Sequence, residues 1–243
     1  MSGAVYLDLD GTLLDPGGLL VPESLMTLAV VRDAGLRPVV LTGRSRWAAT
    51  AIARTLGIDD VVCELGAVVL VDGRLQLAAP EAVPFPRRPL LAALDGLPAQ
   101  EHEPGTPRMS GLVLRSAVPA DDLTDELHAA GLRGWCAVDN GPSHLPLDDG
   151  RPSRVVHVLP SGTDKATGVR MHLQLRDLLP GACAVIGDSK ADLACHAVVP
   201  RTIVVRSPDE EALTEAARLG LRVTEATGAA GALEAVRHVV THP

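Results

Sequence analysis

The sequence predicts an α/β fold, in which a Rossmann-like, doubly wound parallel sheet core is interrupted by an inserted α+β unit. Three observations predict it. Apolar runs alternate with helix-patterned segments at the start of the chain, the alternation breaks between two stretches rich in proline and glycine, and it then resumes. Such alternation is typical of parallel βαβ units. We therefore expect residues 1–80 and 154–243 to form the core and residues 81–153 to form the insertion.

The first half of the core shows three apolar runs that predict buried strands, at residues 5–9, 38–41 and 61–63. Apolar side chains at helical spacing predict helices over residues 22–34 and 45–56, which end at Gly35 and Gly57. Residues 68–77 break this rhythm, because they form two short strand patterns around an Asp-Gly turn.

The inserted unit begins in a proline-rich segment, residues 80–89. Its pattern predicts helices at residues 90–94 and 121–130 and strands at residues 111–116 and 132–138. A loop-rich stretch, residues 139–153, leads to another strand at residues 154–159, where we expect the core to resume.

The second half of the core returns to alternating strands and helices. Strands are predicted at residues 182–186, 202–205 and 221–224, and helices at residues 165–179, 191–197 and 209–219, with a last helix ending near residue 240. Both halves thus contribute strands to one sheet.

The composition of the 243-residue chain leaves room for one large domain or two modest ones. The formal net charge of -8 argues against nucleic acid or an anionic membrane as the main partner, because both require a basic face. Residues 1–4 show no basic leader pattern and no apolar run reaches about 18 residues, so we expect a cytoplasmic enzyme. Of the 22 cationic residues only Lys165 and Lys190 are lysines, which suggests that Lys165 is present for its compact charge.

Acidic and hydroxyl side chains follow three of the predicted strands. Asp8 and Asp10 close the first strand, Thr42 follows the second, and Asp188 and Asp192 follow a strand in the second half of the chain. Residues beyond the carboxyl ends of parallel strands share one crevice. Because alternate residues of an extended chain point the same way, Asp8 and Asp10 can both face it. Such a set of carboxylates suits a hard divalent cation, and Mg²⁺ is the natural choice.

A phosphate group fits the same crevice. The Thr42 hydroxyl and the backbone amides of Gly43 and Arg44, at the start of a predicted helix, can hold phosphate oxygens. Lys165 adds positive charge, but it precedes the second glycine of its segment, so the P-loop pattern of nucleotide hydrolases fails. The sequence therefore predicts magnesium-dependent chemistry on a small phosphorylated substrate.

Four motifs resemble those of the haloacid dehalogenase superfamily of phosphatases and follow that family's order. Residues 8–13 match its first motif, D-x-D-G-T-L, in full; residues 41–44 (L-T-G-R), 164–168 (D-K-A-T-G) and 187–192 (G-D-S-K-A-D) resemble the other three. The insertion resembles the class-two cap of the Cof-type sugar phosphatases, and residues 63–67 (C-E-L-G-A) are similar to the E-N-G-A at the entry to that cap. Leu65 and Ala191 stand where asparagine is usual, which affects no catalytic carboxylate.

The resemblance implies a two-step reaction. Asp8 would attack phosphorus to form an aspartyl phosphate, and Asp10 would protonate the leaving alkoxide and then activate water. Thr42 and Lys165 would stabilise the transferring phosphoryl group. We further expect Thr12 and the closed cap to favour the protonated form of Asp10.

The resemblance also implies a magnesium site. Mg²⁺ would be held by the Asp8 carboxylate, the Asp10 backbone carbonyl and Asp188, with Asp192 orienting or binding the ion. The inserted cap would select the substrate, with Arg108, Arg115 and His144 as candidates for contacting a second anionic group or sugar hydroxyls. Side chains of these three kinds are more often solvated on the surface than bound to a substrate.

The substrate expected from these features is a small phosphorylated metabolite, above all a sugar phosphate. Aromatic residues make up 2% of the chain, and Trp135 is the one candidate stacking platform in the cap. Two alternatives are open. The first is a phosphotransferase or phosphomutase like the phosphomannomutases, which resemble this architecture. The second is a non-catalytic binding module on the same fold. Dehalogenase chemistry would leave Asp10 without a purpose.

Overall fold

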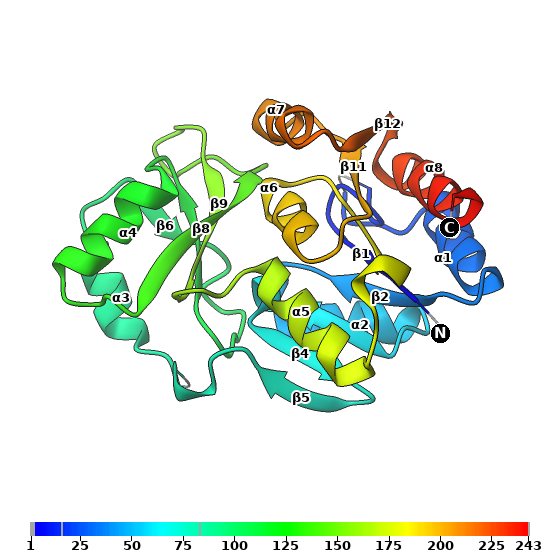
Figure 1. The fold of residues 1–243 in the computed structure, drawn as a ribbon. Coiled ribbons are helices and arrows are strands. Elements are labelled where there is room, and N and C mark those ends of the chain that lie inside the picture. Colours follow the sequence, from blue (N-terminus) through cyan, green and yellow to red (C-terminus); the bar gives the residue numbers. More distant parts are fainter. Residues whose placement is uncertain (1–2, 16, 83, 243) are drawn as a thin grey trace.

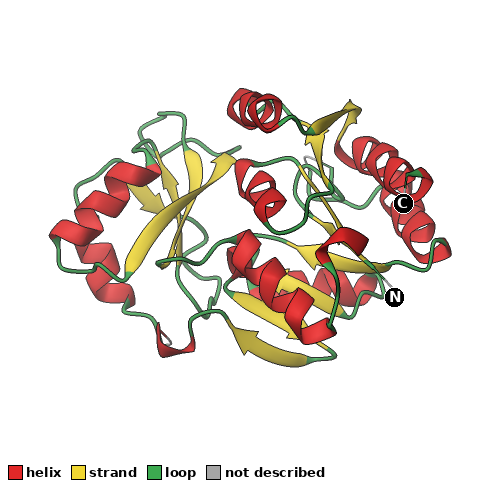
Figure 2. Cartoon of the chain, in the orientation of Figure 1, coloured by secondary structure: helices red, strands yellow, loops and turns green. Residues whose placement is uncertain are grey.

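The computed structural model describes residues 3–15, 17–82 and 84–242, which form two sheets with separate helices (Figures 1 and 2). Met1, Ser2, Pro16, Val83 and Pro243, which fall within the expected core and insertion, lie outside the described residues. The α/β fold class predicted from the sequence is confirmed. In the part of the chain that is described, no helix is long and apolar enough to cross a membrane.

The larger sheet forms the core and is mostly parallel. Its strands are β1 (Ala4–Leu7), β2 (Arg37–Leu41), β3 (Asp60–Cys63), β4 (Val68–Val71), β5 (Arg74–Leu77), β10 (Ala184–Gly187), β11 (Thr202–Arg206) and β12 (Arg222–Thr227). Their order is β12-β11-β10-β1-β2-β3-β4-β5, with β4 and β5 antiparallel. Strand β1 therefore lies between β10 and β2, so segments distant in sequence end side by side.

Helices cover both faces of this sheet because side chains alternate along each buried strand. Val5 and Leu7 of β1 pack in the cluster that includes α1 (Pro22–Asp33), α2 (Arg46–Thr55) and α8 (Gly228–Thr241). Ala4 and Tyr6 face the opposite cluster, which contains side chains of α5 (Lys165–Arg176). Next to α5, α6 (Lys190–Leu193) and α7 (Glu210–Leu219) pack together over β11.

Two predicted helices are shorter than expected. Helix α5 ends at Arg176 because Asp177 adopts a left-handed backbone with φ of 51°, which terminates the helix before residue 179. The helix predicted over residues 191–197 divides into α6 and a 3-10 turn, Ala194–Ala197.

The smaller sheet forms the cap. Its antiparallel strands are β6 (Ala99–Glu101), β7 (Leu112–Ser116), β8 (Trp135–Pro142) and β9 (Arg154–Pro160), in the order β6-β7-β9-β8. Helices α3 (Arg87–Ala93) and α4 (Ala120–Ala129) pack on one face through Leu90, Leu94, Leu123 and Leu127. Figure 1 shows both helices on the side of the cap away from the core. The other face of the cap sheet is thus turned toward the core.

The strand expected to return the chain to the core at residues 154–159 is present but belongs to the cap. As β9 it pairs with β7 and β8, with Val158 opposite Leu112 and Ala137. The expectation is wrong because an apolar run predicts a strand but not the sheet that it joins. The chain returns to the core layers with α5, and β6 is a further cap strand that the sequence pattern did not indicate.

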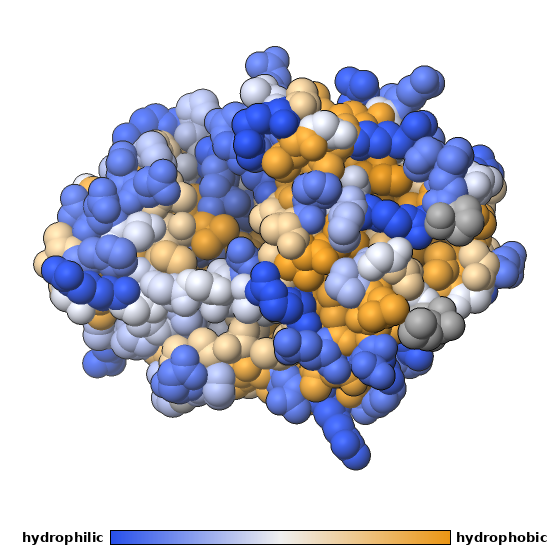
Figure 3. Space-filling view, viewed as in Figure 1, coloured by the Kyte–Doolittle hydropathy of each residue, from blue (hydrophilic) through white to orange (hydrophobic). Residues whose placement is uncertain are grey.

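The surface differs between the two parts. Figure 3 shows hydrophobic residues gathered over the core side and a mostly hydrophilic cap side in this view. Among the described residues, the exposed large hydrophobic side chains follow the same division. Leu145 belongs to the cap, and the others belong to the core: Leu19, Leu20, Leu25, Met26, Trp47, Leu175 and Leu179.

Candidate active site

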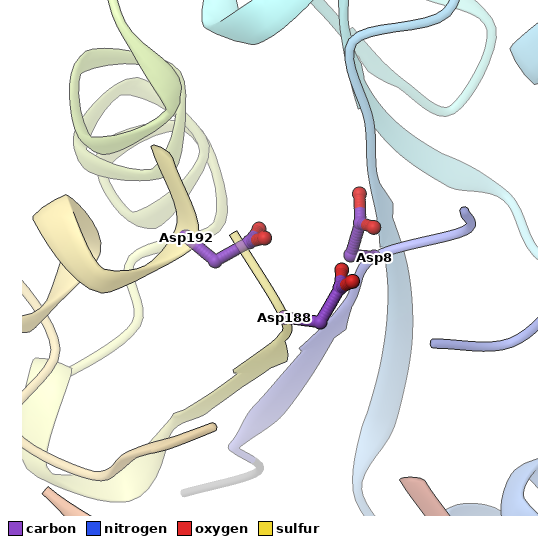
Figure 4. A group of neighbouring side chains, drawn as sticks. All are labelled: Asp8, Asp188 and Asp192. Atoms are coloured by element: carbon purple, nitrogen blue, oxygen red, sulfur yellow. The ribbon is translucent and has the colours of Figure 1, made fainter. Parts of the chain in front are cut away.

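Three carboxylates converge beyond the ends of β1 and β10. Asp8 follows β1, Asp188 follows β10, and Asp192 lies on α6. Each offers an oxygen within 4.8 Å of the other two, and Figure 4 shows them facing a common space. The structure thus brings together acids that are about 180 residues apart in the sequence.

Lys165 lies within this cluster. Its Nζ donates hydrogen bonds to Asp8 Oδ1 at 2.8 Å and to Asp192 Oδ1 at 2.7 Å, and only 1% of the side chain is exposed. Lys165 is the first residue of α5, and Asp164 caps the helix by accepting a hydrogen bond from Thr167 N. The cap residue fixes where the helix begins and therefore where the ammonium group points.

The charges of this cluster do not balance. Burial raises the pKa of Asp8 well above its usual value, and Asp192 and Asp188 raise it further, although Lys165 opposes the shift. Burial and the Asp192 charge raise the pKa of Asp188 to about 7. Burial would lower the pKa of Lys165, but Asp192 and Asp8 raise it above its usual value. Three carboxylates facing one lysine fit a divalent cation, which would supply the missing positive charge with the oxygen ligands it prefers.

Asp192 is held on both carboxylate oxygens. Oδ1 accepts from Lys165, and Oδ2 accepts from Ser189 N at 3.1 Å and Ser189 Oγ at 2.6 Å. A Cβ atom at Gly187 would lie 2.2 Å from Asp192 Cγ, so the glycine is needed for this close approach. This arrangement fits a role for Asp192 in orienting Lys165 better than a role as a direct metal ligand.

Asp10 lies apart from the buried carboxylates. Its side chain is 57% exposed and forms an ion pair with Arg44, whose Nε is 2.9 Å from Oδ2. Among the described residues, Thr12 forms no hydrogen bond with Asp10. Its Oγ1 instead donates to Asp188 Oδ1 at 3.5 Å. The partner of Asp10 is therefore Arg44.

The turn after β2 lies beside this site. Thr42 is fully buried, and its Oγ1 accepts a hydrogen bond from Arg44 N at 3.1 Å. The carbonyl of Gly43 accepts from Arg108 Nη1 of the cap at 3.0 Å. Of the three predicted cap residues, Arg108 is thus the one in contact with a core motif.

The other predicted cap residues lie elsewhere. Arg115 donates to Pro146 O and to Gln100 Oε1, both within the cap. His144 is exposed to solvent. Trp135 is buried with the cap helices and packs against Phe85 at 6.3 Å between ring centroids, so it offers no stacking platform. Arg108 also lines a cavity of about 470 Å³ formed by residues between 84 and 113, and Asp8, Asp188 and Asp192 are not part of its lining.

Two cap residues that sequence reasoning missed lie next to Gly43. A Cβ atom at Gly43 would be 2.9 Å from Asn140 Nδ2 and 3.0 Å from His157 Nε2. Asn140 is on β8 and His157 is on β9, and neither belongs to a recognisable motif. The signal that could have found His157 is a polar residue inside an otherwise apolar run, Val-Val-His-Val-Leu.

Glu64 connects the core to the cap. Its Oε1 accepts from Arg46 N, the first residue of α2, and its Oε2 accepts from Met109 N at 2.9 Å and Ser110 N at 3.1 Å. Glu64 and Leu65 both have left-handed backbones, with φ of 49° and 57°. Leucine disfavours this left-handed backbone conformation. The Leu65 side chain is nevertheless fully buried and packs in the core cluster.

The remaining fourth-motif residues have structural contacts. Ala191 is buried in the core. Lys190 Nζ forms an ion pair with Glu211 Oε2 on α7 at 2.6 Å. Lys190 is therefore directed toward α7.

Comparisons with known proteins agree with this geometry. Residues 5–79 match the family model of haloacid dehalogenase-like hydrolases. A phosphoglycolate phosphatase of Pyrobaculum neutrophilum is 30% identical over 190 residues, which cover 77% of this chain and 76% of that protein. The sucrose-phosphatase of Synechocystis, solved with sucrose and phosphate, superimposes with a TM-score of 0.75 at 19% identity, covering 98% of both chains.

A haloacid dehalogenase subclass IIB sugar phosphatase has the same fold, with a TM-score of 0.69 at 14% identity over 98% of both chains. The motif order, the inserted four-stranded cap and these likenesses lead to one assignment. The chain belongs to the haloacid dehalogenase-like hydrolases and is a phosphatase with an inserted four-stranded cap.

Proposed function

We propose that this phosphatase hydrolyses the phosphomonoester of a small metabolite through an aspartyl phosphate formed on Asp8. The observation that supports this most is the state of the Asp8 carboxylate. Its Oδ1 accepts a hydrogen bond from buried Lys165 at 2.8 Å, while Oδ2 accepts none of the hydrogen bonds found in the described residues. One oxygen is thus anchored and the other is available for attack.

In the first step, Asp8 Oδ2 attacks phosphorus and the bond from phosphorus to the ester oxygen breaks. The leaving alkoxide takes a proton from the Asp10 carboxyl group. In the second step, Asp10 removes a proton from water, whose oxygen attacks the same phosphorus. Inorganic phosphate leaves and the Asp8 carboxylate is restored.

Arg44 and Lys165 would stabilise the charge that spreads over the phosphoryl oxygens. Arg44 forms an ion pair with the Asp10 carboxylate before substrate binds. If Arg44 turns to a phosphoryl oxygen when substrate arrives, Asp10 is released to carry the proton. Thr42 Oγ1 and the Gly43 amide are the nearest further donors along the same turn.

The carboxylates of Asp8 and Asp188 are the residues that would hold Mg²⁺, together with the Asp10 backbone carbonyl. The bound ion would act as a Lewis acid that neutralises phosphate charge. Asp192, with both oxygens already hydrogen-bonded, would keep Lys165 and the metal in place.

The substrate is a small phosphorylated metabolite. Relatives of this chain are named phosphoglycolate phosphatases, and solved structures with the same fold are a sucrose-phosphatase and a sugar phosphatase. Sugar phosphates and phosphorylated carboxylic acids are therefore the two classes to test first.

The test is phosphate release from a panel of both classes with Mg²⁺, with EDTA in place of Mg²⁺, and with the Asp8→Asn variant. We expect wild-type turnover with Mg²⁺ only, and a loss for Asp8→Asn of at least about 1,000-fold. Release of phosphate without any bisphosphate activator would argue against a mutase. Failure of every substrate with the folded, Mg²⁺-loaded enzyme would refute the proposal and favour a binding module.

A further inference from the structure

Three polar side chains of the cap surround the backbone of Gly43, one residue from Thr42. Arg108 Nη1 donates to the Gly43 carbonyl at 3.0 Å. Asn140 Nδ2 and His157 Nε2 lie 2.9 Å and 3.0 Å from the point where a Cβ atom at Gly43 would be. They come from a loop, β8 and β9, so three separate cap segments meet over the proposed phosphate site.

These side chains have hydrogen-bonding capacity that the protein does not use. His157 is 2% exposed, yet its Nδ1 has no hydrogen-bond partner among the described residues, and the same holds for the buried Oδ1 of Asn140. Buried polar atoms in folded proteins nearly always have a partner. Two such atoms on neighbouring strands, beside a reactive site, indicate a place that a ligand completes.

Arg108 contributes the charge of this group. Lys165 is paired with Asp8 and Asp192, and Arg44 is paired with Asp10. In contrast, none of the ion pairs among the described residues includes the half-buried Arg108 guanidinium. Burial lowers the pKa of Arg108, and the more distant charges of Glu64 and Glu103 only partly oppose this. A partly desolvated cation with no carboxylate in direct contact is stabilised when a ligand supplies the negative charge.

His157 adds a neutral hydrogen-bonding group rather than a second charge. Burial lowers the pKa of His157 well below its usual value, and the positive charges of Arg108 and Lys165 lower it further. At neutral pH the imidazole can therefore donate from one ring nitrogen and accept at the other. The Asn140 amide likewise offers one donor and one acceptor group.

We propose that Arg108, Asn140 and His157 form the subsite for the leaving group, and that this subsite takes a carboxylate on the alcohol part of the substrate. Arg108 would pair with the carboxylate, while Asn140 and His157 would hydrogen-bond to it or to a neighbouring hydroxyl. This inference rests on the proposed hydrolysis and selects a phosphorylated hydroxy acid over a neutral sugar phosphate.

The competing explanation for Arg108 is purely structural, because its bond to the Gly43 carbonyl also joins the cap to the core. That bond uses one of the five N–H groups of the guanidinium. A structural role alone would affect every substrate equally, whereas pairing with a carboxylate affects only substrates that have one. A comparison of matched substrates therefore separates the two roles.

The experiment measures kcat/KM with Mg²⁺ for two pairs of substrates that differ in replacement of a carboxylate by a hydroxymethyl group. The pairs are phosphoglycolate with 2-hydroxyethyl phosphate, and 3-phosphoglycerate with glycerol 3-phosphate. We expect wild type to prefer the carboxylate in at least one pair by about 10- to 100-fold, as for a hydrogen-bonded charge pair.

The variants are Arg108→Met, His157→Ala and Arg115→Met. Arg108→Met should bring the preference close to one by lowering kcat/KM for the carboxylate substrate, and His157→Ala should reduce it in part. Arg115→Met is the matched control, because Arg115 is a cap arginine whose hydrogen bonds stay within the cap. It should leave the preference unchanged even if total activity falls.

The outcomes are distinguishable. If wild type hydrolyses none of the four substrates or any other phosphomonoester, the proposed function fails. If it hydrolyses both members of each pair equally, or if Arg108→Met lowers both by the same factor, the carboxylate subsite is refuted while the phosphatase proposal stands. A preference that Arg108→Met removes and Arg115→Met keeps supports the subsite.

Discussion

The ion pair between Asp10 and Arg44 is the residue-scale feature that most constrains the chemistry. Asp10 is exposed and held by Arg44, whereas Asp8 is buried and held by Lys165. Two carboxylates separated by one residue therefore have different environments, which suits different roles. The proposed mechanism accordingly assigns attack on phosphorus to Asp8 and proton exchange with the leaving group and water to Asp10.

Asp10→Asn should uncouple the two chemical steps. The variant cannot donate or accept the proton, so kcat on alkyl phosphates should fall by about 100- to 10,000-fold. With 4-nitrophenyl phosphate, whose leaving group needs little protonation, one equivalent of nitrophenolate should appear rapidly before slow turnover. Stopped-flow absorbance measures this burst. Normal turnover by Asp10→Asn would contradict the acid and base role.

At the scale of elements, the position of Lys165 depends on how α5 packs against the turn Glu64–Gly66. A Cβ atom at Gly168 would lie 2.5 Å from Val62 Cγ1 and 2.7 Å from Gly66 Cα. The first turn of α5 therefore rests directly on the turn between β3 and β4. This close packing links the third motif to the turn whose Glu64 binds the cap loop.

Gly168→Ala should consequently destabilise the protein, although alanine is the better helix former. Overpacking against backbone atoms should cost about 1–3 kcal/mol of unfolding free energy and displace Lys165, lowering kcat. Gly181→Ala is the control, because that site is open and should change stability by less than about 0.5 kcal/mol. Urea denaturation of both variants checks this, and equal stabilities would contradict the packing argument.

A second contact between elements lies inside the core. Tyr6 of β1 hydrogen-bonds to His172 Nδ1 at 2.8 Å, and His172 Nε2 lies 3.0 Å from Asp60 Oδ2 of β3. Arg176 of α5 binds Asp60 Oδ1 at 2.5 Å. Burial opposes ionisation of Asp60, but the hydrogen bonds from His172 and Arg176 outweigh it and hold its pKa well below the usual value. This network joins α5 to two strands.

Asp60→Asn should lower the unfolding free energy by about 2–3 kcal/mol at pH 7. Because the folded-state pKa is depressed, the contribution of Asp60 is complete above its unfolded pKa of about 3.9 and is lost as pH falls toward the folded value. The difference between wild type and variant should therefore be constant from pH 7 to 5 and shrink below about pH 4. Urea denaturation across this range tests it, with the exposed Asp59→Asn as control. A difference that grows on acidification would contradict the assignment.

Much of the fold and of the candidate site could be predicted from the sequence at the level of strands and helices. Strand ends bearing Asp8, Thr42 and Asp188 meet because parallel strands share a carboxyl edge, and that rule needs only local patterns. The sheet that residues 154–159 join could not be predicted, because Val-Val-His-Val-Leu suits either sheet and only its partners decide.

Side-chain partners were harder to predict than positions. Lys165 was expected near the carboxylates, but the partner expected for Asp10 was Thr12, whereas the structure gives Arg44. Asn140 and His157 were missed because their role depends on how the cap sheet faces Gly43, a tertiary relation that no local motif encodes.

At the scale of the whole molecule, charge couples the core to its cap. Glu64 of the core accepts from two amides of the cap loop, and Arg154 of β9 lies 3.5 Å from Asp209 and 3.7 Å from Glu211 of the core. The unbalanced carboxylates of Asp8, Asp188 and Asp192 in turn make the stability of the fold sensitive to divalent cations.

Mg²⁺ should therefore raise the melting temperature of the metal-free protein. At a concentration 100 times Kd, binding to the folded state adds about 2.7 kcal/mol, and EDTA should remove this together with activity. Asp188→Asn, which lacks a proposed ligand, should show a much smaller shift. Differential scanning fluorimetry with and without Mg²⁺ provides the measurement. An equal shift in wild type and variant would place the ion elsewhere.

The covalent role of Asp8 is tested most directly by trapping the intermediate. The enzyme is quenched during turnover of a hydrolysed substrate and treated with borohydride, which reduces an aspartyl phosphate to homoserine, and peptides are then sequenced by mass spectrometry. We expect homoserine at position 8, dependent on substrate and Mg²⁺ and absent from Asp8→Asn. Homoserine at position 10 or at another carboxylate, or full turnover by Asp8→Asn, would contradict the mechanism.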